Sequence, residues 1–476
     1  MARSIRHYGT AITSPSLRQL ASPRLFFGWH ALTGGILRSF QAKTVFAHRR
    51  VLKIVLLISC AHALVHLLEQ SIASVETVIS SEYGLDKTQS AYLGSALRFP
   101  YGLGAILAGL LADRIGGKRV LLLYLFGAAT VCASFLFSRS SGMVYGQLFA
   151  LGSLASIYHP AGLGILANET TVKNRSRALG LHGIFGSVGI ASAPFLAAIM
   201  LTIRPGEWRT YYVLLAALSG CLGLLIWWNF KPTVHQASNI DAQKSGRKQD
   251  KSKPAVVTSG AAAVTFQLKP YLMMIASGAC GGIVYGGVLH FLPRYLQESG
   301  SGQLPLLSLG SSISLSAIGN YAAALALVCG AFGQYTAGRW ATPKKLPRQI
   351  STAYALNIPF LIWMTFAEGP YRLLAACLWA FVHFMNQPLY NSLLSEFVPQ
   401  HRRSLGFGFS NMLGFGIGAL GPTLVAWFGI ILGDYTNSYA VLACFAFVAS
   451  MLVLPLMNPK LAKREIDGSD TDASPE

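Results

Sequence analysis

Charged residues are scarce in this chain. They make up 12% of the 476 residues, whereas hydrophobic residues make up 53%. A soluble domain carries about 25% charged residues, so the composition excludes an ordinary soluble fold. Apolar runs of about 20 residues, each able to cross a ~30 Å hydrocarbon core as a helix, recur along the chain. The sequence predicts an all-α membrane protein with about twelve transmembrane helices, near residues 51–80, 88–112, 118–138, 142–168, 176–202, 208–230, 270–296, 309–338, 348–367, 370–395, 404–430 and 435–457.

Acidic residues are scarcer still, and none occurs before Glu69. The resulting net charge of +20 is concentrated in alternate loops and the C-terminal tail, which excludes the continuous basic surface of a nucleic-acid-binding protein. The clusters are Lys118 and Arg119; Lys173, Arg175 and Arg177; Lys244, Arg247, Lys248, Lys251 and Lys253; Lys344, Lys345 and Arg348; Arg402 and Arg403; Lys460, Lys463 and Arg464. Because cytoplasmic loops carry an excess of bases, we expect both termini in the cytoplasm of a cell (inner) membrane protein, an organelle membrane being the alternative.

Paired cysteines and nucleotide-binding loops are also missing. The seven cysteines all lie in apolar runs without C-x-x-C spacing, so neither a disulfide nor a cysteine metal site is indicated. No G-x-x-x-x-G-K-[ST] loop is present, which disfavours an ATP-driven pump. We expect no enzyme activity and no cofactor.

The chain divides around a basic, Pro- and Ser-rich linker. We expect a basic cytoplasmic tail (1–50), a six-helix bundle (51–230), the linker (231–268), a second six-helix bundle (269–457) and a cytoplasmic tail (458–476). The first tail fits a disordered segment, a basic amphipathic helix on the membrane surface or an organelle transit segment. Three features recur at a shift of 228 residues, namely His159-Pro160 with Gln387-Pro388, Arg175 with Arg403, and Pro194 with Pro422. Such a repeat is typical of transporters whose halves rock about a central site.

Ionisable residues inside the apolar runs are the candidates for chemistry, because burying them in a membrane is costly. His62, His66 and Glu69 share one face of the first span, and Glu76 continues the stripe. Two imidazoles and two carboxylates can bind and pass a proton, so these four are the proton-coupling candidates. Structural hydrogen bonding is the alternative. Cation transport by the first three is a further one, although no resident metal is predicted.

Arg98 in the second span is the second outlier. We expect it to face a cavity, where it pairs with Glu69 or Glu76 or binds an anionic substrate. The other substrate-cavity candidates are Tyr158, His159, Tyr285, His383, Asn386 and Gln387. His182 is expected to be structural, and His290 and Arg294 to be interfacial.

The run Gly109–Arg119 has the spacing G-x-x-x-D-R-x-G-x-K-R between the second and third spans. It resembles the loop between the second and third helices of major facilitator superfamily transporters, where it marks a conformational latch. The resemblance implies latch roles for Gly109, Asp113, Arg114, Gly116, Lys118 and Arg119, with Glu169, Arg175, Glu396 and Arg402 as their partners. The second copy, near Arg339, lacks the acid.

Four further stretches are similar to fosmidomycin-resistance-type exporters. They are Ser59-Cys-Ala-His62 with Ser81–Leu85, Ser156–Pro160, and Gly186–Pro194. The resemblance implies an antiporter that expels a small compound against proton entry, and we expect it to be monomeric. Arg98 departs from that subfamily and favours an anionic substrate. Two alternatives remain: a proton-coupled uptake symporter for an organic anion, and a non-transporting membrane receptor or assembly partner with the same fold.

Overall fold

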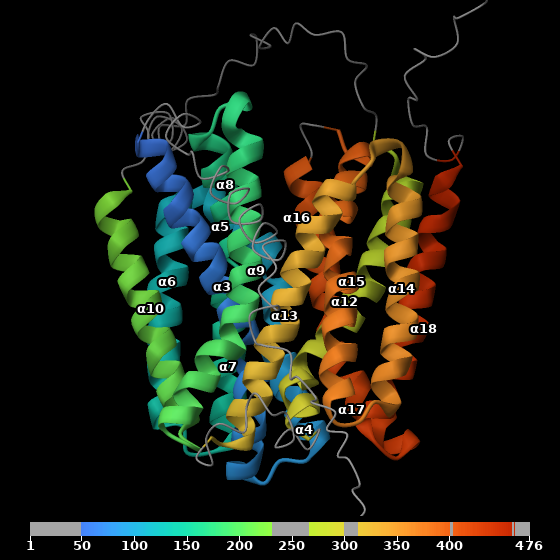
Figure 1. Cartoon of the computed structure of the whole chain (residues 1–476). Helices are drawn as coiled ribbons and strands as arrows, with labels where there is room; N and C mark the ends of the chain where they lie inside the picture. The colour runs from blue at the N-terminus through green and yellow to red at the C-terminus, as the bar shows by residue number, and fades with distance from the viewer. Residues whose placement is uncertain (1–48, 231–265, 299–312, 400–402, 459–460, 462–476) are drawn as a thin grey trace, which may run out of the picture. The chain divides into compact units, whose positions relative to one another are not determined.

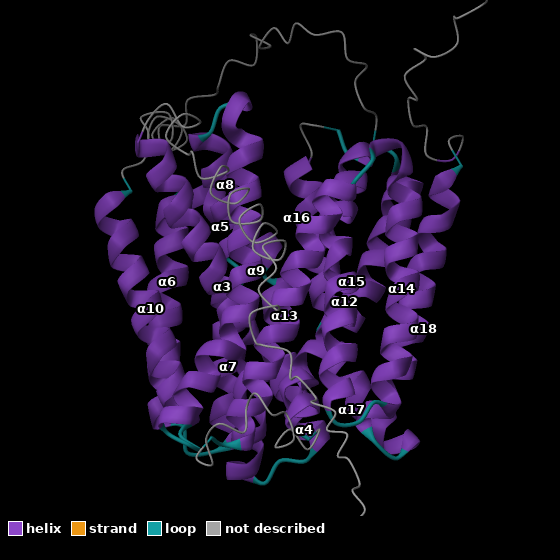
Figure 2. Cartoon of the chain, viewed as in Figure 1, coloured by secondary structure: helices purple, strands orange, loops and turns teal. Residues whose placement is uncertain are grey.

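The computed structural model describes residues 49–230, 266–298, 313–399, 403–458 and 461, and their secondary structure is helical without a strand (Figure 2). The expected N-terminal tail, apart from its last two residues, most of the linker and most of the C-terminal tail lie outside these residues. Met1–Lys53 and Ile54–Glu476 are separate units, and the contacts that follow lie within the second.

The helices before the linker form the first bundle (Figure 1). They are α3 (Arg49–Tyr83), α4 (Lys87–Leu103), α5 (Ala105–Ile115), α6 (Gly117–Ser134), α7 (Ser141–Ala155), α8 (Tyr158–Glu169), α9 (Val172–Ile203) and α10 (Trp208–Asn229). Within it, α6 packs against α7 and α10, and α4 packs against α7.

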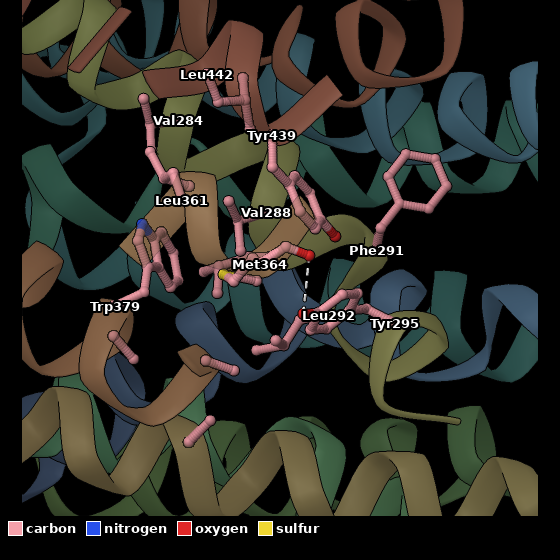
Figure 3. Close-up of a cluster of buried hydrophobic side chains, with 14 of the residues drawn as sticks. Val284, Val288, Phe291, Leu292, Tyr295, Leu361, Met364, Trp379, Tyr439 and Leu442 are labelled. Atoms are coloured by element: carbon pink, nitrogen blue, oxygen red, sulfur yellow. Dashed lines mark hydrogen bonds between the residues drawn. The ribbon is translucent and has the colours of Figure 1, made fainter. Parts of the chain in front are cut away.

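The helices after the linker form the second bundle. They are α12 (Leu268–Gln297), α13 (Leu315–Trp340), α14 (Leu346–Phe366), α15 (Pro370–Phe397), α16 (Arg403–Gly418), α17 (Gly421–Leu432) and α18 (Ser438–Val453). Here α13 packs against α15, α14 against α15 and α18, and α12 against α16 and α18. Figure 3 shows part of its core, where Trp379, Met364 and Tyr295 pack together and the Tyr295 hydroxyl donates to the Met364 carbonyl oxygen (3.0 Å).

Nine helical segments of the described part are long and apolar enough to cross a membrane, or ten when the bent pair α4 and α5 counts as one. α14 and α15 are 21 and 28 residues long but are not among them. With these two, the helices form the twelve membrane-length segments that the sequence predicts. The protein is therefore a multi-pass membrane protein.

Three of these segments are broken. α4 and α5 meet at Gly104 with a 42° bend, α7 and α8 are separated by Ser156 and Ile157, and α16 and α17 by Ala419 and Leu420. Pro160 explains the second break, because it lacks the N–H that would bond to the Ser156 carbonyl. A β-carbon on Gly104 would come within 2.3 Å of the Ser156 hydroxyl oxygen, so two of the breaks pack directly against each other.

The two bundles meet where α9 packs on α13 and where α4 packs on α16 and α17. We call the end of the molecule with the turn between α3 and α4 the α3–α4 end (lower in Figure 1), and the opposite end, with the turn at Gly116, the α5–α6 end. Polar contacts join the bundles from Ser187 in the middle of α9 to the α3–α4 end. The pairs are Ser187 with Gln334, Gln70 with Tyr285, Ser95 with Thr423, Ser74 with Asn320, Glu76 with Arg294, Leu201 with Ser314, Tyr92 with Trp427, and Lys87 with Asp434.

That half of the interface is also tightly packed. A cavity bordered by Gln70, Ser74 and Pro194 measures about 10 Å³, room for about one water molecule. The structure therefore shows the state in which the α3–α4 end is closed.

Candidate functional site

The stripe expected on the first span lies on α3 and is buried. His62, His66 and Glu69 retain 7%, 4% and 0% of their exposure. The His66 Nδ1 donates to Glu69 Oε2 (2.9 Å), and the His66 Nε2 lies 3.2 Å from the Nε2 of His62. The three side chains therefore form one continuous row of close polar contacts in the first bundle.

Glu69 is also the centre of a contact between helices. Arg98 of α4 donates from Nη1 to Glu69 Oε1 (2.8 Å) and from Nη2 to Gln70 Oε1 (2.9 Å). Of the two acids considered from the sequence, Arg98 thus contacts Glu69. The Arg98 Nε is buried and makes no hydrogen bond within the described part of the chain. One donor of the guanidinium is therefore uncommitted.

The second bundle reaches this pair through Tyr285 of α12. The Gln70 Nε2 donates to the Tyr285 hydroxyl (2.9 Å), and the Arg98 guanidinium carbon lies 5.4 Å from the centre of the Tyr285 ring. Sequence reasoning missed Gln70, although it directly follows Glu69. The charge pair lies within the first bundle and is contacted by the second bundle through Tyr285.

His182 of α9, which was expected to be structural, packs directly against His62. Its ring stacks on His62 at 3.8 Å between centroids, and its carbonyl oxygen accepts from the His62 Nδ1 (2.7 Å). The Tyr158 oxygen lies 3.0 Å from the His182 Nε2. A β-carbon on Gly186 would come within 2.5 Å of the His62 ring, so this glycine makes room for the imidazole. The Gly186–Gly189 spacing was the signal that this face of α9 meets α3.

Glu76 lies one level nearer the α3–α4 end and binds the other bundle. It is buried, and it accepts two hydrogen bonds from Arg294 of α12 (2.8 and 2.9 Å) and one from Ser90 of α4 (2.5 Å). Arg294 and His290, expected near the membrane interface, pack between the two bundles. His290 has no exposed surface, and it lies where a β-carbon on Gly94 would come within 2.4 Å of its ring.

The remaining cavity candidates lie in two groups. His159, half-buried at the start of α8, has its Nε2 2.8 Å from the Tyr101 hydroxyl and its ring 6.4 Å from that of Phe415 in α16. Tyr158 is fully buried and donates to the Ile58 carbonyl oxygen (2.6 Å), which is a structural contact.

In the second bundle, His383 bonds to Asn357 of α14 (2.9 Å) and stacks on Trp379 (4.8 Å between centroids). The Asn386 amide donates to the His383 carbonyl oxygen (3.2 Å). Gln387 is exposed and bonds to Gln334, which in turn bonds to Ser187 of the first bundle. Gln387 is therefore the member of this group that faces the other bundle.

The expected latch residues lie around the Gly116 turn. Gly116 has φ +88° and joins α5 to α6, a conformation that favours glycine. Lys118 donates to the Trp227 carbonyl oxygen at the end of α10 (3.0 Å), and Arg114 and Arg119 are exposed. Gly109 in α5 approaches Pro160, 3.9 Å from where its β-carbon would be.

Of the partners expected for this turn, Glu169, Arg175 and Glu396 lie in the described part of the chain. Arg175 donates to the carbonyl oxygens of Ala167 and Thr170 (2.9 and 3.1 Å), which caps α8 rather than pairing with Glu169. Glu396 lies in the last turn of α15. The side chain of Asp113 and the whole of Arg402 lie outside the described part of the chain.

An ion pair outside the membrane-spanning segments joins the bundles at the α3–α4 end. Lys87 lies 3.0 Å from Asp434, and both side chains are about half exposed, at 47% and 43%. Partial burial by itself raises the pKa of the Asp434 carboxyl. The hydrogen bond and charge of Lys87, with hydrogen bonds from Thr436 and the Tyr435 amide, outweigh it and hold the pKa below the usual 3.8.

In the described part of the chain, twelve membrane-length helical segments form two bundles with a buried ion pair contacted from both, the arrangement of a polytopic membrane transporter. Residues 58–422 match the Major Facilitator Superfamily, and the chain belongs to this family. The narrower resemblance, to fosmidomycin-resistance-type exporters, is not singled out by the relatives described next.

Curated relatives agree with the family. The chain is 26% identical over 252 residues, 52% of its length, to a probable sulfoacetate transporter of Cupriavidus necator. It is 29% identical over 164 residues, 33% of its length, to a probable L-galactonate transporter of Escherichia coli. The matched regions span 57% and 34% of those two relatives.

Solved structures share the fold. A nucleoside transporter, NupG, covers 85% of this chain and 99% of its own, with a TM-score of 0.62 at 12% identity. A bacterial homologue of the human lysosomal transporter Spinster covers 87% and 97%, with a TM-score of 0.64 at 15% identity.

Proposed function

We propose that this protein is a secondary transporter that moves a small organic anion together with a proton by alternating access. The observation that carries the proposal is the buried Glu69–Arg98 pair, which is contacted by Tyr285 of the opposite bundle. A guanidinium binds carboxylates and sulfonates through several parallel hydrogen bonds, and Arg98 still has its Nε to offer.

The contact between Arg98 and Glu69 determines whether the proton and the substrate favour or oppose each other's binding. An anionic substrate has to displace the Glu69 carboxylate from the guanidinium, and a proton on Glu69 removes the charge that holds it there. The proton and the anion therefore favour each other's binding, and this mutual coupling is reciprocal by thermodynamic linkage. The charged and titratable groups that surround Glu69 are His66 on its own helix, Arg98 and Tyr101 on α4, and Tyr285 on α12.

Mutual coupling is the basis of symport. The antiport expected from the resemblance to exporters requires the opposite, a substrate that competes with the proton. A cationic compound that pairs with Glu69 would do so. Antiport of a cation, with export as its direction, is therefore the second candidate function, and the charge of the substrate decides between the two.

The relatives support an anionic substrate. The two described above are named for sulfoacetate and L-galactonate, and another, from Thermus thermophilus, is named a probable nitrate/nitrite antiporter. All of these are anions at neutral pH. A tetracycline resistance protein is also among the relatives, and it supports the export alternative.

We further propose that the α5–α6 end faces the cytoplasm, with both termini on that side of a cell membrane and a monomer as the working unit. The base-rich turns of the described part, between α5 and α6, α8 and α9, and α13 and α14, alternate with the other turns of the helices, as the positive-inside bias requires. The α3–α4 end, which is closed in this state, would face away from the cytoplasm. His159, Tyr285, His383, Asn386 and Gln387 would then contact the rest of the substrate beside Arg98. In the opposite state, the turn at Gly116 and its partners would close the cytoplasmic end.

The test is reconstitution in proteoliposomes that contain a pH-sensitive dye. The panel contains sulfoacetate and galactonate as anions, a neutral sugar of similar size, and tetracycline. We expect an inward gradient of an anion to carry protons in the same direction, and Arg98→Gln to abolish the preference for anions. Protons moving opposite to a cation would establish the antiport alternative. Failure of every compound to move protons would reject proton coupling, and an unchanged preference in Arg98→Gln would reject anion recognition by this residue.

A further inference from the structure

Three imidazoles converge beside the charge pair. They belong to His62 and His66 of α3 and His159 of α8, and each offers a ring nitrogen within 4.8 Å of the other two. The distances between ring centroids are 4.8 Å for His62 and His66, and 5.5 Å from each of these to His159. The cluster lies within the first bundle, so it persists when the bundles move relative to each other.

Their partners determine which nitrogens are free. The His62 Nδ1 faces a backbone carbonyl oxygen and the His66 Nδ1 faces a carboxylate oxygen, and both of these can only accept a hydrogen bond. Both Nδ1 atoms therefore carry hydrogen. In the neutral imidazoles, the two Nε2 atoms, 3.2 Å apart, then present lone pairs to each other. Two lone pairs at this distance repel unless a cation lies between them.

The spacing suits a metal ion. With metal–nitrogen distances of about 2.05 Å, two ligands of a tetrahedral zinc ion lie about 3.3 Å apart, and the centroids of their rings about 5 Å apart. The two Nε2 atoms are already 3.2 Å apart. The centroid distances of 4.8 and 5.5 Å lie on either side of the value of about 5 Å for such a site. Only the third nitrogen, which lies within 4.8 Å of the other two, has to approach, by up to about 1.5 Å.

The surroundings also have the form of a metal site. Glu69 and the His182 carbonyl accept from the Nδ1 atoms, which is how histidine ligands of metals are oriented and made more basic. Gly186 leaves the space that the His62 ring occupies. His159 is half-buried, the most exposed of the three, and gives an ion a way in.

We propose that His62, His66 and His159 bind one divalent transition-metal ion of the zinc class, with Glu69 and the His182 carbonyl as outer acceptors. A set of three nitrogens suits zinc and its transition-metal neighbours, whereas calcium and magnesium prefer oxygen. Three protein ligands leave the fourth position open to water, as in exchangeable sites. This inference goes beyond the proposed function, because it requires no transport.

The test measures metal binding directly. The full-length protein, purified in detergent and stripped with a chelator, is titrated with Zn²⁺ in competition with a chromophoric zinc indicator. It is also titrated with Co²⁺, whose visible absorption is intense only in tetrahedral sites. We expect one ion per chain and a tetrahedral cobalt spectrum. His62→Gln and His66→Gln should each abolish this binding, and Glu69→Gln should weaken it by about tenfold or more.

His383→Gln is the matched control, because His383 is an equally buried histidine of the other bundle whose Nδ1 bonds to Asn357. It should leave the stoichiometry and the spectrum unchanged. Each variant is first checked by size-exclusion chromatography and thermal unfolding. If His62→Gln does not fold, His159→Gln replaces it, since that side chain is less buried.

Two outcomes overturn the proposal. One is retention of metal by the double variant of His62 and His66, which would place the ion at another of the eleven histidines. The other is the absence of saturable binding to the native protein, which would mean that a shared proton alone separates the two Nε2 atoms. Neither outcome bears on whether anions move with protons, so failure here is distinct from failure of the proposed function.

Discussion

Replacing Glu69 by Gln should destabilise the protein far more than replacing an acid at the surface. Arg98 is buried, with 4% of its side chain exposed, and Glu69 is its acidic partner. Removing one member of a buried ion pair costs about 3–5 kcal/mol, because the other charge stays in the low-dielectric interior. Asp434→Asn is the control. It breaks the half-exposed pair with Lys87, and such a pair contributes about 0–1 kcal/mol.

The assay is thermal unfolding of the purified protein in detergent, followed by tryptophan fluorescence. From those magnitudes, the fall in Tm for Glu69→Gln should be at least about three times that for Asp434→Asn. A transported anion should restore more stability to Glu69→Gln than it adds to the native protein, because it supplies the missing negative charge beside Arg98. Equal falls in Tm would refute the reasoning about the buried pair. Equal stabilisation by the anion would refute its binding at Arg98.

Three further outcomes are expected. Gly189→Ala should cost about 1–3 kcal/mol in the same assay, because its β-carbon would lie 2.0 Å from a backbone oxygen of α3, whereas Gly183→Ala, with open space around it, should not destabilise the protein. Because the pKa of Asp434 is lowered on folding, the Lys87 ion pair should contribute stability above about pH 4 and lose that contribution as the pH falls. The Tm values of the native protein and Asp434→Asn should therefore converge in acid. A constant difference between the two Tm values would contradict this. Glu76→Gln should favour opening of the α3–α4 end, seen as a longer distance between spin labels placed on the two bundles there, and an unchanged distance distribution would show that this ion pair does not hold the end closed.

The membrane fold could be predicted because its signal is repeated in every apolar run. The position of a residue along a single helix was a much weaker guide to its contacts. Arg294 lies near the end of α12 and was assigned to the membrane interface for that reason. Its actual partner, Glu76, belongs to the other bundle, and no spacing within either helix reveals a contact across 218 positions.

The site residues also fall into those that the sequence could predict and those that it could not. The row His62, His66 and Glu69 could be predicted because its members share one helix and its 3.6-residue period. The contacts of His182 could not, because the residues three and four positions away on α9 are apolar or glycine, and the contacts depend on how α9 stacks against α3. Gln70 was missed because its neighbour on the chain carried the charge. Contacts between residues of different helices could be found only from the structure.

The low apolarity of α14 and α15 has a consequence for how the protein is made. These two helices follow one another through a turn of three residues, pack together, and share the hydrogen bond between Asn357 and His383. An isolated helix that entered the bilayer would expose one of these polar groups to lipid at a cost of about 1–3 kcal/mol. Entering as a hairpin, the two satisfy each other. We therefore expect the insertion machinery to release α14 and α15 into the membrane as one unit, so that synthesis of α15 is what secures α14.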